Sequence, residues 1–246
     1  MARVLVICLL AFLLGGVGLC FASRREDSRV WRERLIKFIT YFFIVNVVLA
    51  AAIAGHWVLS GVLLLIAVLG AWELYRALSR EGTGTLDAAW GVGAAYLLIA
   101  VGAVEFAWSS ESGKSVYVYL VVCTFDGFSQ VVGQLLGRHQ LAARVSPGKT
   151  IEGSIGGLFA AMGMGLLLRP MVKWNGPGSL LACCFIVAAA LTGDLLASLV
   201  KRKCGIKDFG NLLPGHGGIL DRFDSFLFSA AAYVLAREVV RWFGMR

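Results

Sequence analysis

The feature that most constrains this chain is a series of long apolar segments, each about the length of a membrane-spanning helix. A helix needs ~20 apolar residues to cross a hydrocarbon core of about 30 Å. The 246 residues are 59% hydrophobic, well above the content of soluble domains. We therefore predict an all-α, polytopic integral membrane protein of about eight transmembrane helices, with residues 1–246 in a single membrane domain. The segments lie approximately at residues 4–22, 36–54, 57–75, 88–108, 115–137, 153–172, 179–200 and 223–244.

The first apolar segment has two interpretations. It is short, and only Arg3 precedes its apolar stretch, so it could be a cleaved signal peptide. However, Phe21, Ala22 and Ser23 form a weak cleavage pattern, and a polytopic protein needs a first helix to establish its topology. We expect the segment to be retained.

The net charge of +8 has the distribution of a membrane protein, and no nucleic-acid partner is predicted. Most of the 23 Lys and Arg residues follow the first, third, fifth and seventh apolar segments. By the positive-inside rule, these four connections face the cytoplasm and both termini face outward. The sequence predicts a multi-pass protein of the cell (inner) membrane with its polar site near the cytoplasmic face, where basic residues suit anionic lipids and nucleotides. These residues are Arg24, Arg25, Arg29, Arg32, Arg34, Lys37, Arg76, Arg80, Arg138, Arg144, Lys149, Lys201, Arg202, Lys203, Lys207 and Arg222.

The cysteines indicate neither a metal site nor a disulfide framework. They show no CxxC pattern and no Cys/His ligand spacing. We expect them to pack as small apolar residues. They are Cys8, Cys20, Cys123, Cys183, Cys184 and Cys204.

The two halves of the chain differ in polarity. Residues 1–114 are almost wholly apolar and are interpreted as scaffold helices, whereas residues 115–246 carry polar groups within the helices and in loops at 138–152 and 201–222. In the scaffold, Glu73 and Glu105 could be functional, because ionisable groups in lipid are costly. Interfacial pairing with a nearby arginine, such as Arg76, is the favoured interpretation.

Polar residues and glycines recur at three- and four-residue steps in the segment 115–137, which places them on one side of a helix. A carboxylate in a membrane normally lines a cavity or a site, so Asp126 is predicted to do so. Hydrogen bonding between helices is the alternative for the two glutamines. The set is Asp126, Gln130, Gly133, Gln134 and Gly137.

The loop 138–152 ends in Ser146, Lys149 and Thr150 just before an apolar segment. These side chains and the free amides of a helix start could form a phosphate cradle. Ser-Pro-Gly is also an ordinary turn, and Thr150 could simply cap the helix.

The densest group of polar residues lies between residues 194 and 224. Asp194, Ser198 and Lys201 share one helical face, and Asp221 and Asp224 lie three residues apart at the next helix start. Three acids and a hydroxyl could converge on a cation, and oxygen ligands without cysteine or histidine suit Mg²⁺. Between them lie the basic residues Lys201, Arg202, Lys207 and Arg222, together with His216 and the flexible glycines Gly215, Gly217 and Gly218, which could approach phosphates closely.

In these residues the sequence resembles the phosphatidate cytidylyltransferase (CDP-diacylglycerol synthase) family. The specific resemblance covers roughly residues 126–224. The loop Ser146-Pro147-x-Lys149-Thr150-x-Glu152-Gly153 looks like a second stretch of the family's pattern. The main pattern is Ser198-x-x-Lys201-Arg202-x4-Lys207-Asp208-x-Gly210-x-x-Leu213-Pro214-x-His216-Gly217-Gly218-x-x-Asp221-Arg222-x-Asp224.

The resemblance implies transfer of the cytidylyl group of CTP to phosphatidate, giving CDP-diacylglycerol and pyrophosphate. It implies a homodimer in membrane lipid, and a Mg²⁺ centre that in the family includes a monovalent ion such as K⁺. The implied metal ligands are Asp194, Asp221 and Asp224. The implied catalytic residues are these three with Ser198 and Lys207, and the implied substrate-binding residues are Asp126, Ser146, Lys149, Thr150, Glu152, Lys201, Arg202, Asp208, His216, Gly217, Gly218 and Arg222.

The sequence departs from the family's pattern at the two residues after Asp126. The family more often has Asp-Ala-Tyr where this chain has Asp126-Gly127-Phe128. The predicted helix count is also one short of the family's usual set. These differences bear on the lipid preference and on the scaffold around the acyl chains.

Three other functions compete with this prediction. Membrane prenol or dolichol kinases also use CTP but transfer its terminal phosphoryl group to an alcohol, so the products distinguish them. A cytidylyltransferase for an ether lipid differs only in its substrate. A transporter would also place Asp126, Gln130 and Gln134 inside the membrane, but the acids gather at one membrane face and no internal repeat is evident.

Overall fold

The computed structural model describes residues 28–80, 86–213 and 217–244. The predicted first helix, 4–22, lies outside these residues. Each of the seven other apolar segments is a helix in the described part of the chain, so the all-α prediction is confirmed there. The elements are α2 (Ser28–Ala54), α3 (His56–Leu78), α4 (Leu86–Ser109), α5 (Ser112–Leu136), β1 (Gln140–Ala142), β2 (Ser146–Thr150), α6 (Ile151–Val172), α7 (Gly176–Lys203) and α8 (Leu220–Trp242).

Five of the helices in the described residues, α3 to α7, are long and apolar enough to cross a membrane. The apolar part of α2, Phe38–Ala54, is shorter. Helix α8 is more polar, because its first turns carry Asp221, Arg222 and Asp224. The five helices support an integral membrane protein, and the count of eight crossings stays a prediction.

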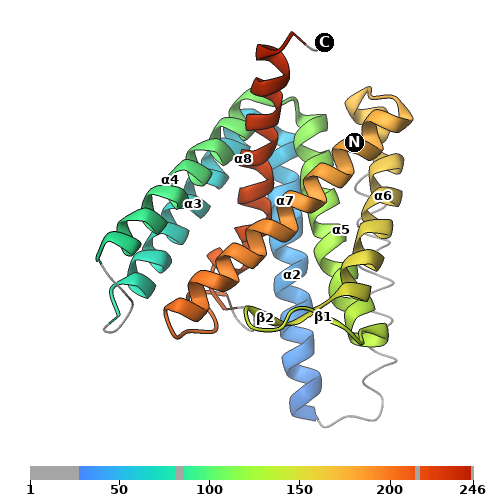
Figure 1. Ribbon diagram of the computed structural model, residues 1–246. Helices are drawn as coiled ribbons and strands as arrows, with labels where there is room; N and C mark the ends of the chain where they lie inside the picture. Colours follow the sequence, from blue (N-terminus) through green and yellow to red (C-terminus); the bar gives the residue numbers. More distant parts are fainter. Residues whose placement is uncertain (1–27, 81–85, 214–216, 245–246) are drawn as a thin grey trace.

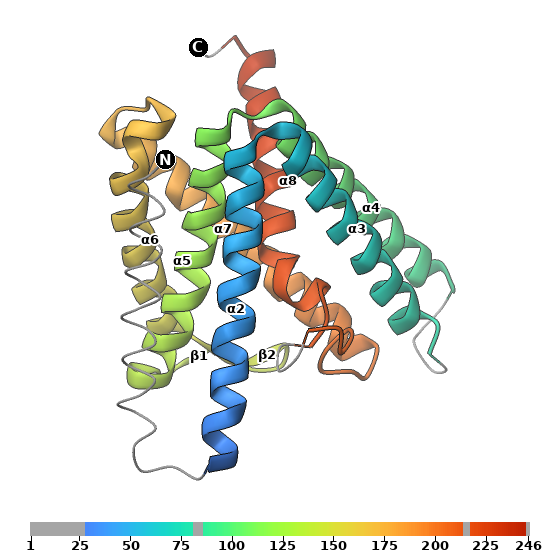
Figure 2. The ribbon, with the colours of Figure 1, turned by 180° about the vertical axis from the view of Figure 1, so that it is seen from behind.

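Helix α5 lies between α6 and α2 and also contacts α7 and α8 (Figures 1 and 2). Its residues 115–122 are all buried. The hydroxyl of Tyr117 donates to the carbonyl of Ser179 at 2.8 Å, which ties α5 to α7. Asp126 lies about one turn beyond this buried stretch, and the fixed position of α5 therefore also fixes the position of Asp126.

Helices α5 and α6 pack against each other through glycines, as small residues permit in membranes. A Cβ atom on Gly157 would lie 2.7 Å from the carbonyl oxygen of Phe125, and one on Gly133 would lie 3.0 Å from Oγ1 of Thr150. Glycine at these positions therefore allows the two helices to approach closely. It brings the start of α6 close to the lower part of α5.

The loop predicted at 138–152 contains a short antiparallel hairpin of β1 and β2. The amide of Ile151 donates to the carbonyl of His139 at 2.9 Å and closes the hairpin at the start of α6. The hairpin crosses one end of the bundle (Figure 1). The hairpin thereby brings Lys149, the basic residue of β2, to the cavity-lining residues at the end of α7 and the start of α8.

The basic connections share one end of the bundle. Figures 1 and 2 show the start of α2, the end of α3, the hairpin and the α7–α8 connection at this end, whereas the α4–α5 and α6–α7 connections lie at the opposite end. This arrangement has the alternation that the charge pattern predicts. Its cytoplasmic orientation stays a prediction.

Candidate active site

The predicted site residues come together around one cavity of about 460 Å³ at the basic end of the bundle. Its walls come from α2, α5, the hairpin, the start of α6, the end of α7, the α7–α8 connection and the start of α8. Glu152, Gly217 and Gly218 are described but do not line it, and His216 lies outside the described residues. The predicted residues that line the cavity are Asp126, Ser146, Lys149, Thr150, Asp194, Ser198, Lys201, Arg202, Lys207, Asp208, Asp221, Arg222 and Asp224.

Asp194 is held by two groups from different elements. Lys149 of β2 forms an ion pair with Asp194 Oδ2, and both side chains are largely buried. The hydroxyl of Ser198 donates to Asp194 Oδ1 at 3.3 Å, which confirms that Asp194 and Ser198 share a helical face. The ion pair joins the hairpin to α7 across the cavity.

Both carboxylate oxygens of Asp221 interact with other residues of the protein. Lys201 Nζ lies 2.9 Å from Oδ1, while the amides of Phe209 and Gly218 donate to Oδ2 at 2.8 and 2.9 Å. The side chain of Asp221 is 1% exposed. Asp221 therefore ties both ends of the α7–α8 connection to the first turn of α8.

Asp224 lies one turn after Asp221 and close to the other carboxylates of the cavity. Its Oδ1 accepts a hydrogen bond from the amide of Ser225 at 2.7 Å. Its carboxyl lines the same cavity as those of Asp194 and Asp126 and is close enough to interact with their charges. Like charges that share a largely buried site repel one another, and a bound cation would relieve this repulsion.

Among the described residues, no three Asp, Glu, His or Cys side chains form a group that could hold a metal ion. The predicted centre of Asp194, Asp221 and Asp224 is therefore not assembled as one cluster. Asp194 and Asp224 still fit a hard cation, because both are carboxylates that face the same cavity. Asp221 would have to share its carboxylate between Lys201 and a cation.

The side chains of Thr150 and Glu152 accept hydrogen bonds from backbone amides near the start of α6. Thr150 Oγ1 accepts from the amide of Gly153 at 3.0 Å, so Thr150 caps the helix, which was one of its two predicted roles. Glu152 Oε2 accepts from the amides of Arg138 and His139 at 3.1 and 3.2 Å. Its carboxylate thus fastens the hairpin from outside the cavity and does not face a substrate there.

The glycines of the α7–α8 connection contact other parts of the protein. Gly217 has a left-handed φ of 81°, and a Cβ there would lie 3.1 Å from Asp221 Oδ2. A Cβ on Gly218 would lie 2.6 Å from Oε1 of Glu73. The left-handed backbone favours glycine at 217 and the close contact with Glu73 favours it at 218, whereas the sequence suggested an approach to phosphates.

The two scaffold acids differ. Glu105 lies 3.7 Å from Arg237 at the surface, so pairing with an arginine is confirmed for this residue. Glu73 is 3% exposed and accepts from the amides of Ile219 and Leu220 at the start of α8. The expected interfacial pairing was wrong for Glu73, because its carboxylate is buried against these backbone amides.

Several lining residues were not predicted. Ser154 follows Thr150, and Ser225 follows Asp221, by four residues, so helical spacing could have indicated both. The apolar part of the wall has no sequence pattern beyond that of a membrane helix. It comprises Tyr41, Ile44 and Val45 of α2, Tyr119 and Val122 of α5, and Phe223 and Phe226 of α8.

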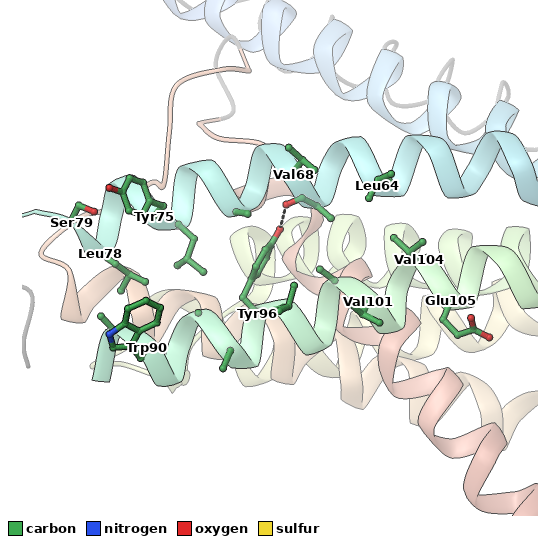
Figure 3. A pocket seen from close by; sticks show the side chains of 18 of the residues that line it. Leu64, Val68, Tyr75, Leu78, Ser79, Trp90, Tyr96, Val101, Val104 and Glu105 are labelled. Carbon is green, nitrogen blue, oxygen red and sulfur yellow. Dashed lines mark hydrogen bonds between the residues drawn. The ribbon is translucent and has the colours of Figure 1, made fainter. Parts of the chain in front are cut away.

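A second cavity, of about 1030 Å³, lies between α3 and α4 (Figure 3). Tyr96 crosses it and donates a hydrogen bond to the carbonyl of Ala67 at 2.8 Å. Its walls are almost entirely apolar, with Glu105 at one end. This lining offers no group of charges comparable with that of the first cavity.

The comparisons with known proteins agree with the position of the first cavity. Residues 94–240 match the sequence model of the Cytidylyltransferase family, and this range includes every predicted site residue. A protein of Staphylococcus haemolyticus named phosphatidate cytidylyltransferase is 39% identical over 71% of this chain and 69% of its own length. Proteins of the same name from Staphylococcus saprophyticus and Staphylococcus epidermidis are 32% and 33% identical, each over 91% of this chain and 86% of their own length.

Proposed function

Because the chain belongs to the cytidylyltransferase family, we propose that it transfers the cytidylyl group of CTP to phosphatidate and produces CDP-diacylglycerol and pyrophosphate. The observation that carries this proposal is the composition of the cavity. One cavity combines charged side chains for phosphate groups with an apolar wall for acyl chains. A substrate with a phosphate headgroup and lipid tails needs both.

The proposed reaction is a single displacement at phosphorus. An anionic phosphate oxygen of phosphatidate attacks the α-phosphorus of CTP, and a new oxygen–phosphorus bond forms. The bond from the α-phosphorus to the oxygen that bridges to the β-phosphate breaks, and pyrophosphate leaves with the electron pair. Because the attacking oxygen is already an anion near neutral pH, no strong general base is required.

The charge of the cavity supports a requirement for an added cation. Its lining holds five aspartates and five Lys or Arg residues, so their formal charges cancel. CTP and phosphatidate are both polyanions, and the neutral lining alone does not balance them. We propose Mg²⁺, which prefers oxygen ligands, with Asp194 and Asp224 as its first candidate ligands and Asp221 as the third. When bound, Mg²⁺ would offset the charge on the triphosphate and on the departing pyrophosphate.

The basic residues are proposed to orient the phosphate groups. Lys149 lies on β2 beside the start of α6, where the helix dipole also favours an anion. Lys207 and Arg222 are exposed residues at the rim of the same cavity. These three cations come from three separate elements and could hold phosphates from different sides.

The position of the cavity favours an enzyme over a transporter. A transport site lies near the middle of the membrane. The lining of this cavity includes the hairpin, the end of α7 and the start of α8, and Figure 1 shows the hairpin at one end of the bundle. We propose that this end faces the cytoplasm, with the protein in the cell membrane. The homodimer and the K⁺ ion implied by the family resemblance belong to the same proposal.

Substrate comparison tests the proposal against its rivals. The purified protein in detergent is incubated with CTP and Mg²⁺, together with phosphatidate, an ether-linked phosphatidate, diacylglycerol or dolichol. We expect pyrophosphate release with phosphatidate. A CDP product with a phosphorylated alcohol would identify a kinase, and turnover of the ether lipid alone would identify the related cytidylyltransferase.

A further inference from the structure

Glu73, near the end of α3, contacts the start of α8 through both carboxylate oxygens. The amide of Ile219 donates to Oε1 at 3.0 Å, and the amide of Leu220 donates to Oε2 at 2.9 Å. Glu73 lies 146 residues before Ile219 in the sequence and does not line the cavity. It therefore acts on α8 from outside the site.

The contact meets a physical requirement of both partners. The first amides of a helix have no acceptor within the helix, and its positive dipole end favours an anion. The N-cap residue of α8, Ile219, supplies no side-chain cap. A buried carboxylate in a membrane protein is costly unless it is compensated. Glu73 and α8 thus satisfy each other.

Glu73 and Asp221 together bind three consecutive backbone amides. Asp221 accepts from the amide of Gly218, and Glu73 accepts from the next two. This arrangement orients the turn that precedes Asp221 and Asp224. A shift of the turn would move both aspartates relative to the cavity.

Two glycines of the α7–α8 connection are explained by the same carboxylate. A Cβ on Gly210 would lie 2.9 Å from Cδ of Glu73, and a Cβ on Gly218 would lie 2.6 Å from its Oε1. Side chains at these positions would displace Glu73 or the connection. Glycine at 210 and 218 therefore allows the α7–α8 connection to pack closely around the Glu73 carboxylate.

We infer that Glu73 is a positioning residue, which caps α8 from α3 and holds Asp221 and Asp224 in their places at the cavity. The inference rests on the proposed function, because that function assigns Asp221 and Asp224 their role in catalysis. It adds a residue from the scaffold half of the chain to the site. Its effect on catalysis passes through the backbone at residues 218–220.

The test compares Glu73→Gln with wild type and with Glu105→Gln, which removes a surface acid from the neighbouring helix. Glutamine keeps one acceptor but turns an NH₂ group toward an amide donor. We expect faster hydrogen exchange at the amides of Ile219 and Leu220, and a kcat per folded molecule lower by roughly 10- to 100-fold, as small misplacements of reacting groups produce. The KM for CTP should change by no more than about twofold, because the cations that bind phosphate stay in place. Glu105→Gln should match wild type in each measurement.

Two results would overturn the inference. One is a rate of amide hydrogen exchange at residues 219 and 220 of Glu73→Gln that equals the wild-type rate. The other is a lower melting temperature with unchanged kcat per folded molecule, which would make Glu73 a stabilising residue only. If Glu73→Gln does not fold, Gly210→Ala displaces the same carboxylate, and the same exchange and kcat measurements decide. An inactive wild-type protein would instead refute the proposed function, while the exchange measurement would still test the cap.

Discussion

Lys201 at the end of α7 and Asp221 at the start of α8 form a buried ion pair of 2.9 Å, in which the two side chains are 12% and 1% exposed. The pair spans the α7–α8 connection. Because Asp221 also accepts from the amides of Phe209 and Gly218, it has a structural role whatever else it binds. Asp224 has a looser environment, with Ser225 as its hydrogen-bonding partner. The two aspartates should therefore respond differently to substitution.

Asp221→Asn should destabilise the protein, and Asp224→Asn should mainly reduce turnover. Loss of Asp221 leaves the Lys201 ammonium buried without its partner, a change that typically costs about 3–5 kcal/mol. Asparagine at 224 can keep the bond to Ser225 but loses a charge in the cavity, so we expect kcat to fall on the order of 100-fold. Thermal melting in detergent and steady-state kinetics measure the two effects.

The double variant Lys201→Met/Asp221→Asn is the control for this prediction. It removes both buried charges and should recover part of the lost melting temperature. A melting temperature for Asp221→Asn equal to that of wild type would contradict the structural role of the Lys201–Asp221 ion pair. A normal kcat for Asp224→Asn at saturating Mg²⁺ would remove Asp224 from the metal site.

The sequence predicted the helices well because a spanning helix is encoded by a long local run of apolar residues. It also predicted a polar site around Asp194, Asp221 and Asp224, and these three line one cavity together with Asp126. They do not form one metal-binding group among the described residues. The contact of Glu73 could not be predicted in this way. Its partners are backbone amides of Ile219 and Leu220, which carry no side-chain signal and lie far away in the sequence.

The hairpin of β1 and β2 was also missed. Its strands have three and five residues, too few for an alternating pattern to be recognised. The Ser-Pro-Gly sequence at its second strand suggested a turn. The closing hydrogen bond, from the amide of Ile151 to the carbonyl of His139, again joins backbone atoms.

Lys207→Ala should weaken CTP binding. Lys207 is exposed at the rim of the cavity, where a charge contact is screened by solvent, so we expect KM for CTP to rise roughly 3- to 5-fold with kcat nearly unchanged. The rise should shrink at high salt. Lys203→Ala is the matched control, because Lys203 is exposed but does not line this cavity. Equal effects of the two substitutions would show that only net charge matters.

Gly157→Ala should destabilise the α5–α6 contact. The added Cβ would meet the carbonyl oxygen of Phe125 at 2.7 Å, and overpacking of this kind costs about 1–3 kcal/mol. Gly163 of the same helix has open space around it, so Gly163→Ala should not lower the melting temperature. If the two variants melt at the same temperature as wild type, the close approach of α5 and α6 is not required.

The predicted topology can be tested with single cysteines in a variant that lacks the six native ones. Replacing the native residues is a safeguard, although burial raises the pKa of the Cys204 thiol and makes it a poor target. An impermeant maleimide added outside the cell should label cysteine at Glu111 or Lys173, and should label one at Arg144 only after permeabilisation. External labelling at position 144 in intact cells would reverse the topology.

The most direct test follows the individual phosphorus atoms of CTP. The purified protein is incubated with phosphatidate, Mg²⁺ and CTP labelled in either the α- or the γ-phosphate, and the lipid is extracted. We expect the α label to enter the lipid as CDP-diacylglycerol and the γ label to leave in pyrophosphate. Entry of the γ label into the lipid, with the α label retained in CDP, would contradict the proposed transfer of the cytidylyl group.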